Sequence, residues 1–454
     1  NIAGQGFSGV YPPDTVGDVG PFHYIQMING SGGALFRIYN KSGTSVAGPT
    51  NLDTLGTGDC ADGLGDPIVL FDELANRWLM SEFSNNGNKL CVYISKTQDP
   101  VTGGWWVYDF QAPDFPDYPK YGVWSNAYLV TSNEGSPAIY AFDRQKMLNG
   151  QAATFQRVTA PQLGGFGFQA LTPADHDGEL PPPVGVPGIL MRHNDDESHS
   201  PGNNNASADF LELWTLQPDF VTPANTVFAG PTRISVTEFD SSLCGLTSFQ
   251  CFPQPSTSTT LDPLREVIMF RLQYRRFSDR ETLVGNFVTD VNGSNRGGIR
   301  WFELRRTTPQ GAWSVHQQGT YSPDASHRWM GSIGQDGAGN LALGYSLTSS
   351  SIVPNIRYVG RLATDTLGTL PQGETILQSG ASTQTTTTRW GDYAALSIDP
   401  HANCAYWFTT EYMSSSNVWA TRVGAFSFTT CRPDIIFADD FESGNRVDWS
   451  FTQP

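Results

Sequence analysis

Short apolar runs, each closed by a turn containing Gly, Asp or Pro, recur along the whole chain. Residues 389–400 begin Arg-Trp-Gly-Asp-Tyr, continue as an alternating segment and end at an Asp-Pro turn before an aromatic segment at 406–412. Residues 65–72 and 77–83 repeat this order, with a Gly-Asp start, an apolar run, a closing Asp and a second aromatic segment. Each pair is typical of a β-hairpin. Because the hairpin recurs near both ends of the chain, the sequence predicts an array of similar sheets.

Seven such units follow one another between residues 14 and 428, and the fourth carries a polar insertion at 194–209 that we expect on a surface loop. The units begin at Asp14, Gly65, Asp117, Pro173, Asp262, Arg328 and Arg389. About sixty residues per unit suit a four-stranded blade, so the sequence predicts an all-β fold, a β-propeller of seven blades of four antiparallel strands. Counts of six or eight blades stay open because the fourth unit is hard to delimit.

Composition narrows the function classes. The chain has 454 residues, and its 47 Gly and 30 Pro indicate many turns. It has no run of eighteen apolar residues, so we expect no membrane span. The net charge of -17 argues against nucleic acid as a partner, because phosphate binding needs clustered Lys and Arg. The same charge opposes self-association, and we expect a monomer.

The six cysteines fall into three local pairs, which predict disulfides in an oxidising compartment. The pairs are Cys60 with Cys91, Cys244 with Cys251, and Cys404 with Cys431. The sequence starts at Asn1 without Met or an apolar signal region, so we expect a processed chain that is secreted, extracellular or on the outer cell surface.

Several segments together resemble a family of large secreted bacterial proteins with a sialidase-like propeller. They are residues 274–277, 298–305, 318–321, 328–332, 357–361 and 389–393. The resemblance covers residues 14–428 and implies the fold and secretion. No general activity is assigned to the family, so it implies little about chemistry. Residues 436–449 resemble a short acidic tail of some secreted Gram-negative proteins. We therefore expect a propeller over residues 1–430 and an acidic C-terminal tail over 431–454.

In a propeller, the loops that enter the innermost strands meet near the axis on one face, where ligand sites collect. These loops contribute Asp14, Asp18, Asp59, Asp62, Asp66, Lys120, Tyr121, Asp175, His176, Asp177, Arg280, Glu281, His327, Arg328, Trp329, Arg389, Trp390 and Asp392. Such charged and aromatic groups are costly to bury without a ligand, an ion or mutual pairing. The sequence therefore places a candidate site at this rim.

Three interpretations of the rim compete. In the first, the protein cleaves an acidic polysaccharide as a lyase or hydrolase, with arginine clamps for anionic groups and tryptophans stacked on sugar rings. The expected substrate-binding residues are Lys120, Arg328, Trp329, Arg389 and Trp390. The expected catalytic residues are Tyr121, His176 or His327 as a base, or Asp66 and Asp392 as the carboxyl pair of a glycosidase.

In the second interpretation the rim binds a glycan without cleaving it, as a lectin-like or adhesive module. The absence of GxSxG, HExxH and P-loop motifs keeps this reading open and gives no reason to expect an organic cofactor. In the third, the Gly-Asp and Arg-Trp pairs are architectural, each Asp accepting backbone N–H bonds and each Arg pairing between blades.

Calcium is the metal that the acidic loops predict, because hard cations take closely spaced oxygen ligands. The expected ligands form two groups, Asp59 with Asp62 and Asp175 with Asp177. Neither group has the spacing of an EF-hand. Zinc is less well supported, since the seven histidines are scattered and His193 and His199 lie in a polar loop.

Overall fold

The strands of the computed structural model group into fours along the chain, each group running from the innermost strand outward. The structure describes residues 1–164, 170–199, 204–205, 207–245, 250–307 and 311–431. The first three groups are β2 (Val16–Val19), β3 (His23–Gly30), β4 (Gly33–Asn40) and β5 (Ser45–Asn51); β6 (Gly63–Asp72), β7 (Arg77–Ser84), β8 (Lys89–Ser95) and β9 (Trp105–Gln111); and β10 (Asp117–Val123), β11 (Tyr128–Asn133), β12 (Pro137–Phe142) and β13 (Phe155–Thr159).

The later groups have the same order. They are β14 (Thr172–Asp177), β15 (Gly188–Asn194), β16 (Phe210–Gln217) and β17 (Val227–Ser235); β18 (Leu272–Arg276), β19 (Arg280–Asp290), β20 (Gly297–Thr307) and β21 (Ser314–Tyr321); β22 (His327–Gln335), β23 (Leu341–Thr348), β24 (Asn355–Arg361) and β25 (Thr375–Gln378); and β26 (Ala395–Ile398), β27 (Ala405–Ser415), β28 (Val418–Ser427) and β1 (Ile2–Gly6). Helices are short: α1 (Arg144–Leu148), α2 (Asp196–His199) and 3-10 turns at Leu52–Leu55, Gly58–Ala61, Pro223–Asn225 and Leu243–Gly245.

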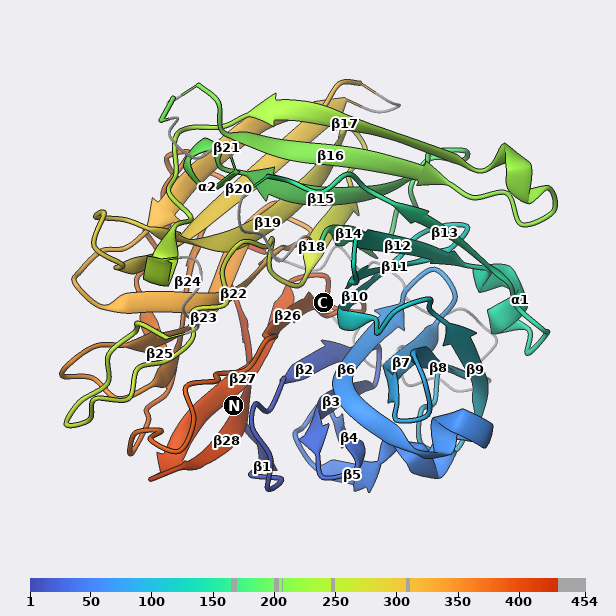
Figure 1. The fold of residues 1–454 in the computed structure, drawn as a ribbon, viewed down its shortest axis with the longest axis horizontal. Coiled ribbons are helices and arrows are strands. Elements are labelled where there is room, and N and C mark those ends of the chain that lie inside the picture. The colour runs from blue at the N-terminus through green and yellow to red at the C-terminus, as the bar shows by residue number, and fades with distance from the viewer. Residues whose placement is uncertain (165–169, 200–203, 206, 246–249, 308–310, 432–454) are drawn as a thin grey trace, which may run out of the picture.

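The groups stand radially around one centre (Figure 1). Each innermost strand contacts the innermost strand of the next group, from β2 through β6, β10, β14, β18 and β22 to β26, and β26 contacts β2. The ring is therefore closed, and the predicted all-β propeller is confirmed. We call the face where the chain enters these innermost strands the entry face, and the opposite face the exit face.

Burial follows the radial position of a strand. The apolar run of β6 and every residue of β23 are buried, whereas β5 and β17 at the periphery are largely exposed. Strands covered on both faces need continuous apolar runs, and outer strands can carry polar residues. This is why the units were visible in the sequence as apolar runs between turns.

Two neighbouring groups merge into one eight-stranded sheet. β14 pairs with β15 only at Thr172 and Pro173, and from Ala174 to Asp177 it pairs with β18 in parallel. The antiparallel arrangement that the sequence predicts is therefore interrupted here, because β14 changes partner partway along its length. The polar insertion of the fourth unit lies between β15 and β16, but Asp195, Ser198, His199 and Asp209 within it are buried, so its described part is not simply the surface loop that the sequence predicts.

The chain's first strand completes the last sheet. β1 pairs with β28 antiparallel, with Ile2 opposite Val423. Tyr24 of β3 and Trp407 of β27 stack across the same junction, with ring centroids 5.2 Å apart. The sequence analysis did not predict this closing strand, and began the first unit at Asp14.

The three predicted disulfides are confirmed. Cys60 bonds Cys91, Cys244 bonds Cys251 and Cys404 bonds Cys431. This number of disulfides is typical of proteins that fold in an oxidising compartment. Among the residues described, no helix is long and apolar enough to cross a membrane. The predicted acidic tail, apart from Cys431, lies outside the described residues.

Candidate active site

Three aspartates, each in or just before the innermost strand of a different sheet, meet at the entry face, and we call Asp14, Asp66 and Asp392 the axial acid cluster. The backbone N–H of Asp392 donates to Asp14 Oδ1 at 2.7 Å. Asn29 links the other two, since its Nδ2 donates to Asp14 Oδ2 and its Oδ1 accepts the N–H of Asp66 at 2.9 Å. Asp14 and Asp392 are buried and Asp66 is half-buried. The first, second and last sheets are thus joined by polar contacts at one point.

Local backbone geometry turns these side chains toward one another. Asp14 and Asp66 have φ values of 45° and 50°, in the left-handed region. Asp66 lies in a β-bulge between Gly65 and Ile68, a device that re-aims a side chain. Tyr118 and Met330 occupy similar bulges with left-handed φ in β10 and β22. The bulge therefore accepts several residue types, and the backbone alone does not require Asp at position 66.

Two basic side chains, Arg389 and Lys120, face the cluster. The Arg389 guanidinium bonds both carboxylate oxygens of Asp392, and its Nε lies 3.4 Å from Asp262 Oδ2. Lys120 is fully buried, with Nζ 3.5 Å from the Tyr118 ring centroid. Within the part of the chain that the structure describes, Lys120 Nζ has no hydrogen-bond partner. Arg389 stays 39% exposed, so the cluster reaches solvent through it.

Burial shifts the protonation of the cluster. Burial, together with the charges of Asp392 and Asp117, raises the pKa of Asp66 to about 8. Burial also raises the pKa of Asp14 well above its usual range, and raises the pKa of Asp392 against the opposing charge of Arg389. Burial holds the pKa of Lys120 well below its ordinary value. At neutral pH the site therefore holds a protonated Asp66 near an Asp392 that is paired with a cation.

Polar residues nearer the exit face have a different role. Arg271 bonds Asp175, and its Nη2 lies 2.7 Å from Asp177 Oδ1. Asp18 accepts the backbone N–H groups of Val19 and Phe71, both at 2.7 Å. These carboxylates connect neighbouring sheets and fit the architectural interpretation. The expected calcium pair Asp175 and Asp177 is instead an ion-pair partner of a buried arginine.

The other expected calcium ligands are also engaged. Asp59 Oδ2 lies 2.6 Å from Lys89 Nζ, and Asp62 Oδ2 accepts from Asn86 Nδ2 at 3.3 Å. In the described segments, neither predicted set belongs to a group of three or more ligands close enough to hold one ion. Two other groups do: His193, His199 and Glu266, and Asp195, Asp196, Glu197 and Asp209.

The predicted clamp and stacking residues are mostly structural. Arg328 is fully buried, with Nη1 2.9 Å from Asp324 Oδ1 and Nε 2.9 Å from Glu374 Oε1. Trp329 and Trp390 are also buried, with ring centroids 5.6 Å apart. The prediction that these three residues contact substrate is wrong, because none presents a surface to solvent. Arg389 does lie at the site, but two aspartates already occupy its guanidinium.

The predicted bases lie away from the axial acid cluster. Tyr121 is buried in the core beside Phe142. His176 is buried in β14, and its Nε2 lies 3.0 Å from the Leu180 carbonyl oxygen. His327 is half-buried against Phe252, and burial lowers its pKa to about 4. The structure thus contradicts Tyr121 and His176 as bases, and places His327 in the wall between sheets.

Replacing Arg328 by Met is expected to lower the free energy of unfolding by about 1–3 kcal/mol, because Glu374 loses one of its buried partners. Urea unfolding measures this loss. The same variant should keep its affinity for any glycan that the wild-type protein binds. Weaker glycan binding at unchanged stability would restore the clamp interpretation.

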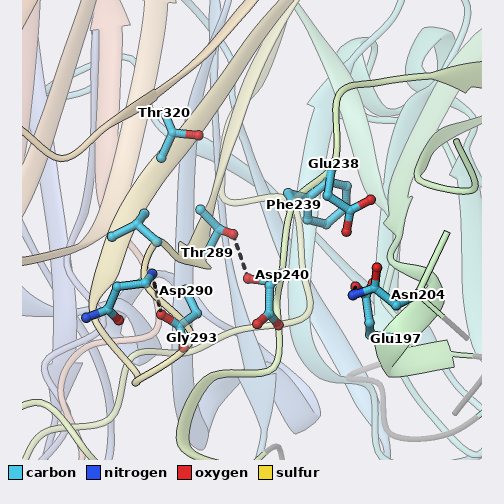
Figure 2. A pocket seen from close by; sticks show the side chains of 11 residues that line it. Glu197, Asn204, Glu238, Phe239, Asp240, Thr289, Asp290, Gly293 and Thr320 are labelled. Atoms are coloured by element: carbon cyan, nitrogen blue, oxygen red, sulfur yellow. Dashed lines mark hydrogen bonds between the residues drawn. The ribbon is translucent and has the colours of Figure 1, made fainter. Parts of the chain in front are cut away.

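A pocket of about 460 Å³ lies off the axis, between the merged sheets of β14–β17 and β18–β21. Figure 2 shows the acidic side chains that line it, and Thr289 bonding Asp240. They are Glu197, Glu238, Asp240 and Asp290, and the lining residues that the structure describes include no Lys or Arg. The pocket therefore suits a neutral or cationic group better than an anion.

Sequence analysis missed Asp117 and Asp262 as neighbours of the cluster. A usable signal for Asp117 was present, because Asp117-Tyr118-Pro119 matches Gly65-Asp66-Pro67 in the preceding unit. Aligning the prolines places Tyr118 in the bulge. Asp262 gives no such signal, since only the fold brings it to Arg389.

Comparisons with known proteins give remote likenesses only. No family model and no curated protein matches the chain, so the family resemblance stays a prediction. It is similar to the endo-arabinase from Bacteroides thetaiotaomicron VPI-5482, with 14% identity, coverage of 68% of this chain and 96% of that one, and a TM-score of 0.31. It is also similar to the GH93 α-L-arabinofuranosidase of Fusarium graminearum, with 11% identity, coverage of 69% of this chain and 93% of that one, and a TM-score of 0.35. A third likeness is to Drosophila Semaphorin 2a, with 8% identity, coverage of 94% of this chain and 76% of that one, and a TM-score of 0.41.

Proposed function

We propose that the protein is a secreted glycoside hydrolase that cleaves a glycan at the axial acid cluster. The supporting observation is the pairing of two carboxyls in different states: Asp66, with a pKa of about 8, and Asp392, bonded to Arg389. Hydrolysis of a glycosidic bond needs one carboxylic acid and one carboxylate, and no cofactor. The three disulfides support the secreted location.

In this mechanism Asp66 donates its proton to the glycosidic oxygen as the bond to the anomeric carbon breaks. Asp392, held as a carboxylate by Arg389, either deprotonates the attacking water or forms a glycosyl ester that water then hydrolyses. In both cases the hydroxyl of water ends on the anomeric carbon and a proton returns to the carboxyl pair. Asp14 is a positioning residue, because it accepts the Asp392 N–H and contacts Asp66.

Hydrolysis fits these residues better than β-elimination. A lyase needs a base near the sugar, and Tyr121 and His176 are buried elsewhere. It also needs a cation for the substrate carboxylate, and the Arg389 guanidinium is shared by Asp392 and Asp262. Five carboxyls, of Asp14, Asp66, Asp117, Asp262 and Asp392, lie near only two basic side chains, and burial lowers the pKa of one of these, Lys120. We therefore propose a neutral glycan in place of the acidic one that the sequence suggested.

Incubation with a panel of neutral and acidic polysaccharides tests the proposal. With neutral polysaccharides, we expect new reducing ends. We expect no ultraviolet absorbance from an unsaturated sugar. Absorbance from unsaturated products would instead identify a lyase. Retention on an immobilised glycan with no product would favour the lectin-like alternative.

The pH dependence of kcat/KM should follow the two carboxyls. Asp66 must be protonated, so activity is expected to fall as pH rises through about 8. Asp392 must be ionised and its pKa is raised, so the acid limb is expected above the ordinary aspartate value of 3.8. A profile measured with a soluble oligosaccharide checks both limbs. Activity that stays constant well above pH 8 would remove Asp66 from the acid role.

A further inference from the structure

Three metal-ligating side chains from three segments converge between the merged sheets. They are His193 of β15, His199 of α2, and Glu266 in the segment that precedes β18. One ligand atom from each lies within 4.8 Å of the others. All three side chains are more than nine-tenths buried, with residue exposures of 2%, 8% and 6%. The group lies apart from the axial acid cluster and has no part in the proposed hydrolysis.

Both histidine rings are oriented by their surroundings. His199 Nδ1 lies 3.1 Å from the Gly164 carbonyl oxygen, which leaves Nε2 facing Glu266 Oε2 at 3.1 Å. A metal-bound histidine commonly donates its second N–H to a carbonyl in this way. His193 stacks on Phe287, with centroids 4.6 Å apart, and meets Phe239 edge-on. The two phenylalanines fix the plane of the His193 ring.

The two ring nitrogens of His193 are buried polar atoms. Neither has a hydrogen-bond partner among the residues described, although the ring is buried. An unpaired buried polar atom costs about 1–3 kcal/mol, so such atoms are rare in folded proteins. A bound cation would satisfy one of these nitrogens and would neutralise the buried Glu266 carboxylate.

We propose that His193, His199 and Glu266 bind a zinc ion. Two imidazoles and a carboxylate are a set of ligands that zinc takes, with a water at the fourth position. The 3.1 Å between His199 Nε2 and Glu266 Oε2 is close to the roughly 3.3 Å edge of a tetrahedron with zinc bond lengths. Nitrogen ligands favour zinc over calcium and magnesium, which take oxygen.

The ion would connect three separate segments of the chain: β15, α2 and the segment that precedes β18. Glu266 lies in the segment from Asp262 to Arg271, which reaches Arg389 at one end and Asp175 at the other. His199 belongs to the polar insertion, and Phe239, which packs on His193, also lines the pocket of Figure 2. Zinc would therefore hold the insertion and this segment against β15.

Metal analysis of the full chain tests the site. After incubation with zinc and transfer to metal-free buffer, about one zinc per chain is expected by mass spectrometry. His193→Phe, which refills the aromatic slot, and Glu266→Gln, which keeps the volume, should each lose the zinc. His401→Gln, a histidine change in the loop between β26 and β27, should retain it. X-ray absorption at the zinc edge should show imidazole ligands.

Thermal unfolding separates zinc binding from a simple ion pair of His199 with Glu266. Chelation should lower the unfolding temperature of the wild-type protein and of His401→Gln, and leave His193→Phe and Glu266→Gln unchanged. Two outcomes would overturn the proposal. One is a wild-type chain without zinc and insensitive to chelation. The other is zinc that persists in the folded fraction of both ligand variants.

Discussion

Replacing Asp66 by Asn is expected to lower kcat/KM for glycan hydrolysis by about 10²–10⁴-fold, the range for loss of a general acid or base. Asn matches a protonated carboxyl in size and charge, and burial keeps Asp66 protonated at neutral pH. The free energy of unfolding should therefore change little. Asp392→Asn should lose activity by a similar factor, because an amide can neither deprotonate the attacking water nor form the glycosyl ester.

Initial rates and urea unfolding on the same preparations check this result. Asp18→Asn is the matched control, since Asp18 is also a buried aspartate of an innermost strand but accepts two backbone N–H groups. Its variant should lose stability and keep its activity per folded molecule. If Asp66→Asn behaved like Asp18→Asn, the cluster would be architecture and the proposed function would fail.

The largest loss of stability is expected from Arg271→Met. Arg271 lies at the centre of the ring, where it bonds Asp175 and Asp177 and reaches the Leu396 carbonyl oxygen of β26. The arginine and both aspartates are more than nine-tenths buried. Removing one partner of a buried ion pair leaves uncompensated charge, which costs about 3–5 kcal/mol.

Urea unfolding followed by tryptophan fluorescence measures the effect. Arg280→Met is the control, because Arg280 pairs with an exposed Asp279, and a change of within about 0.5 kcal/mol is expected there. Adding Asp175→Asn and Asp177→Asn to Arg271→Met should recover part of the loss, since the unpaired carboxylates are then gone. A single variant as stable as the wild type would show that water already compensates these charges.

Most of the fold was predictable because apolar or aromatic runs between turns recur along the chain, although innermost strands such as β14 and β18 are largely polar. Residues 65–72 and 389–400 showed this directly, and each of the seven unit starts lies before an innermost strand or within its first three residues. The closing strand β1 was not predictable, because Ile2–Gly6 has no alternating pattern and its partner lies near the other end of the chain. The partner change of β14 depends on β18, and it too leaves no local signal.

The candidate site was predictable only in part. Asp66, Asp392, Lys120 and Arg389 were found because entry loops must meet at the axis. Trp329 and Trp390 were expected at the rim because of their place at the entries of innermost strands, but both are buried and their rings pack against each other. The ion pairs of Asp175 and Asp177 with Arg271 were not predictable, because Arg271 is distant in sequence, and calcium binding itself stays a prediction.

The pairing of β1 with β28 also constrains how the chain can fold during synthesis. Residues 2–6 are synthesised long before the strand that they join, Val418–Ser427. Until then one edge of the last sheet is absent and the N-terminal segment has no strand to pair with. Domains generally fold as units and exposed strand edges favour misassembly. The last sheet can therefore be completed only after residue 427 has been made, and a nascent chain stalled before residue 418 would remain an open arc.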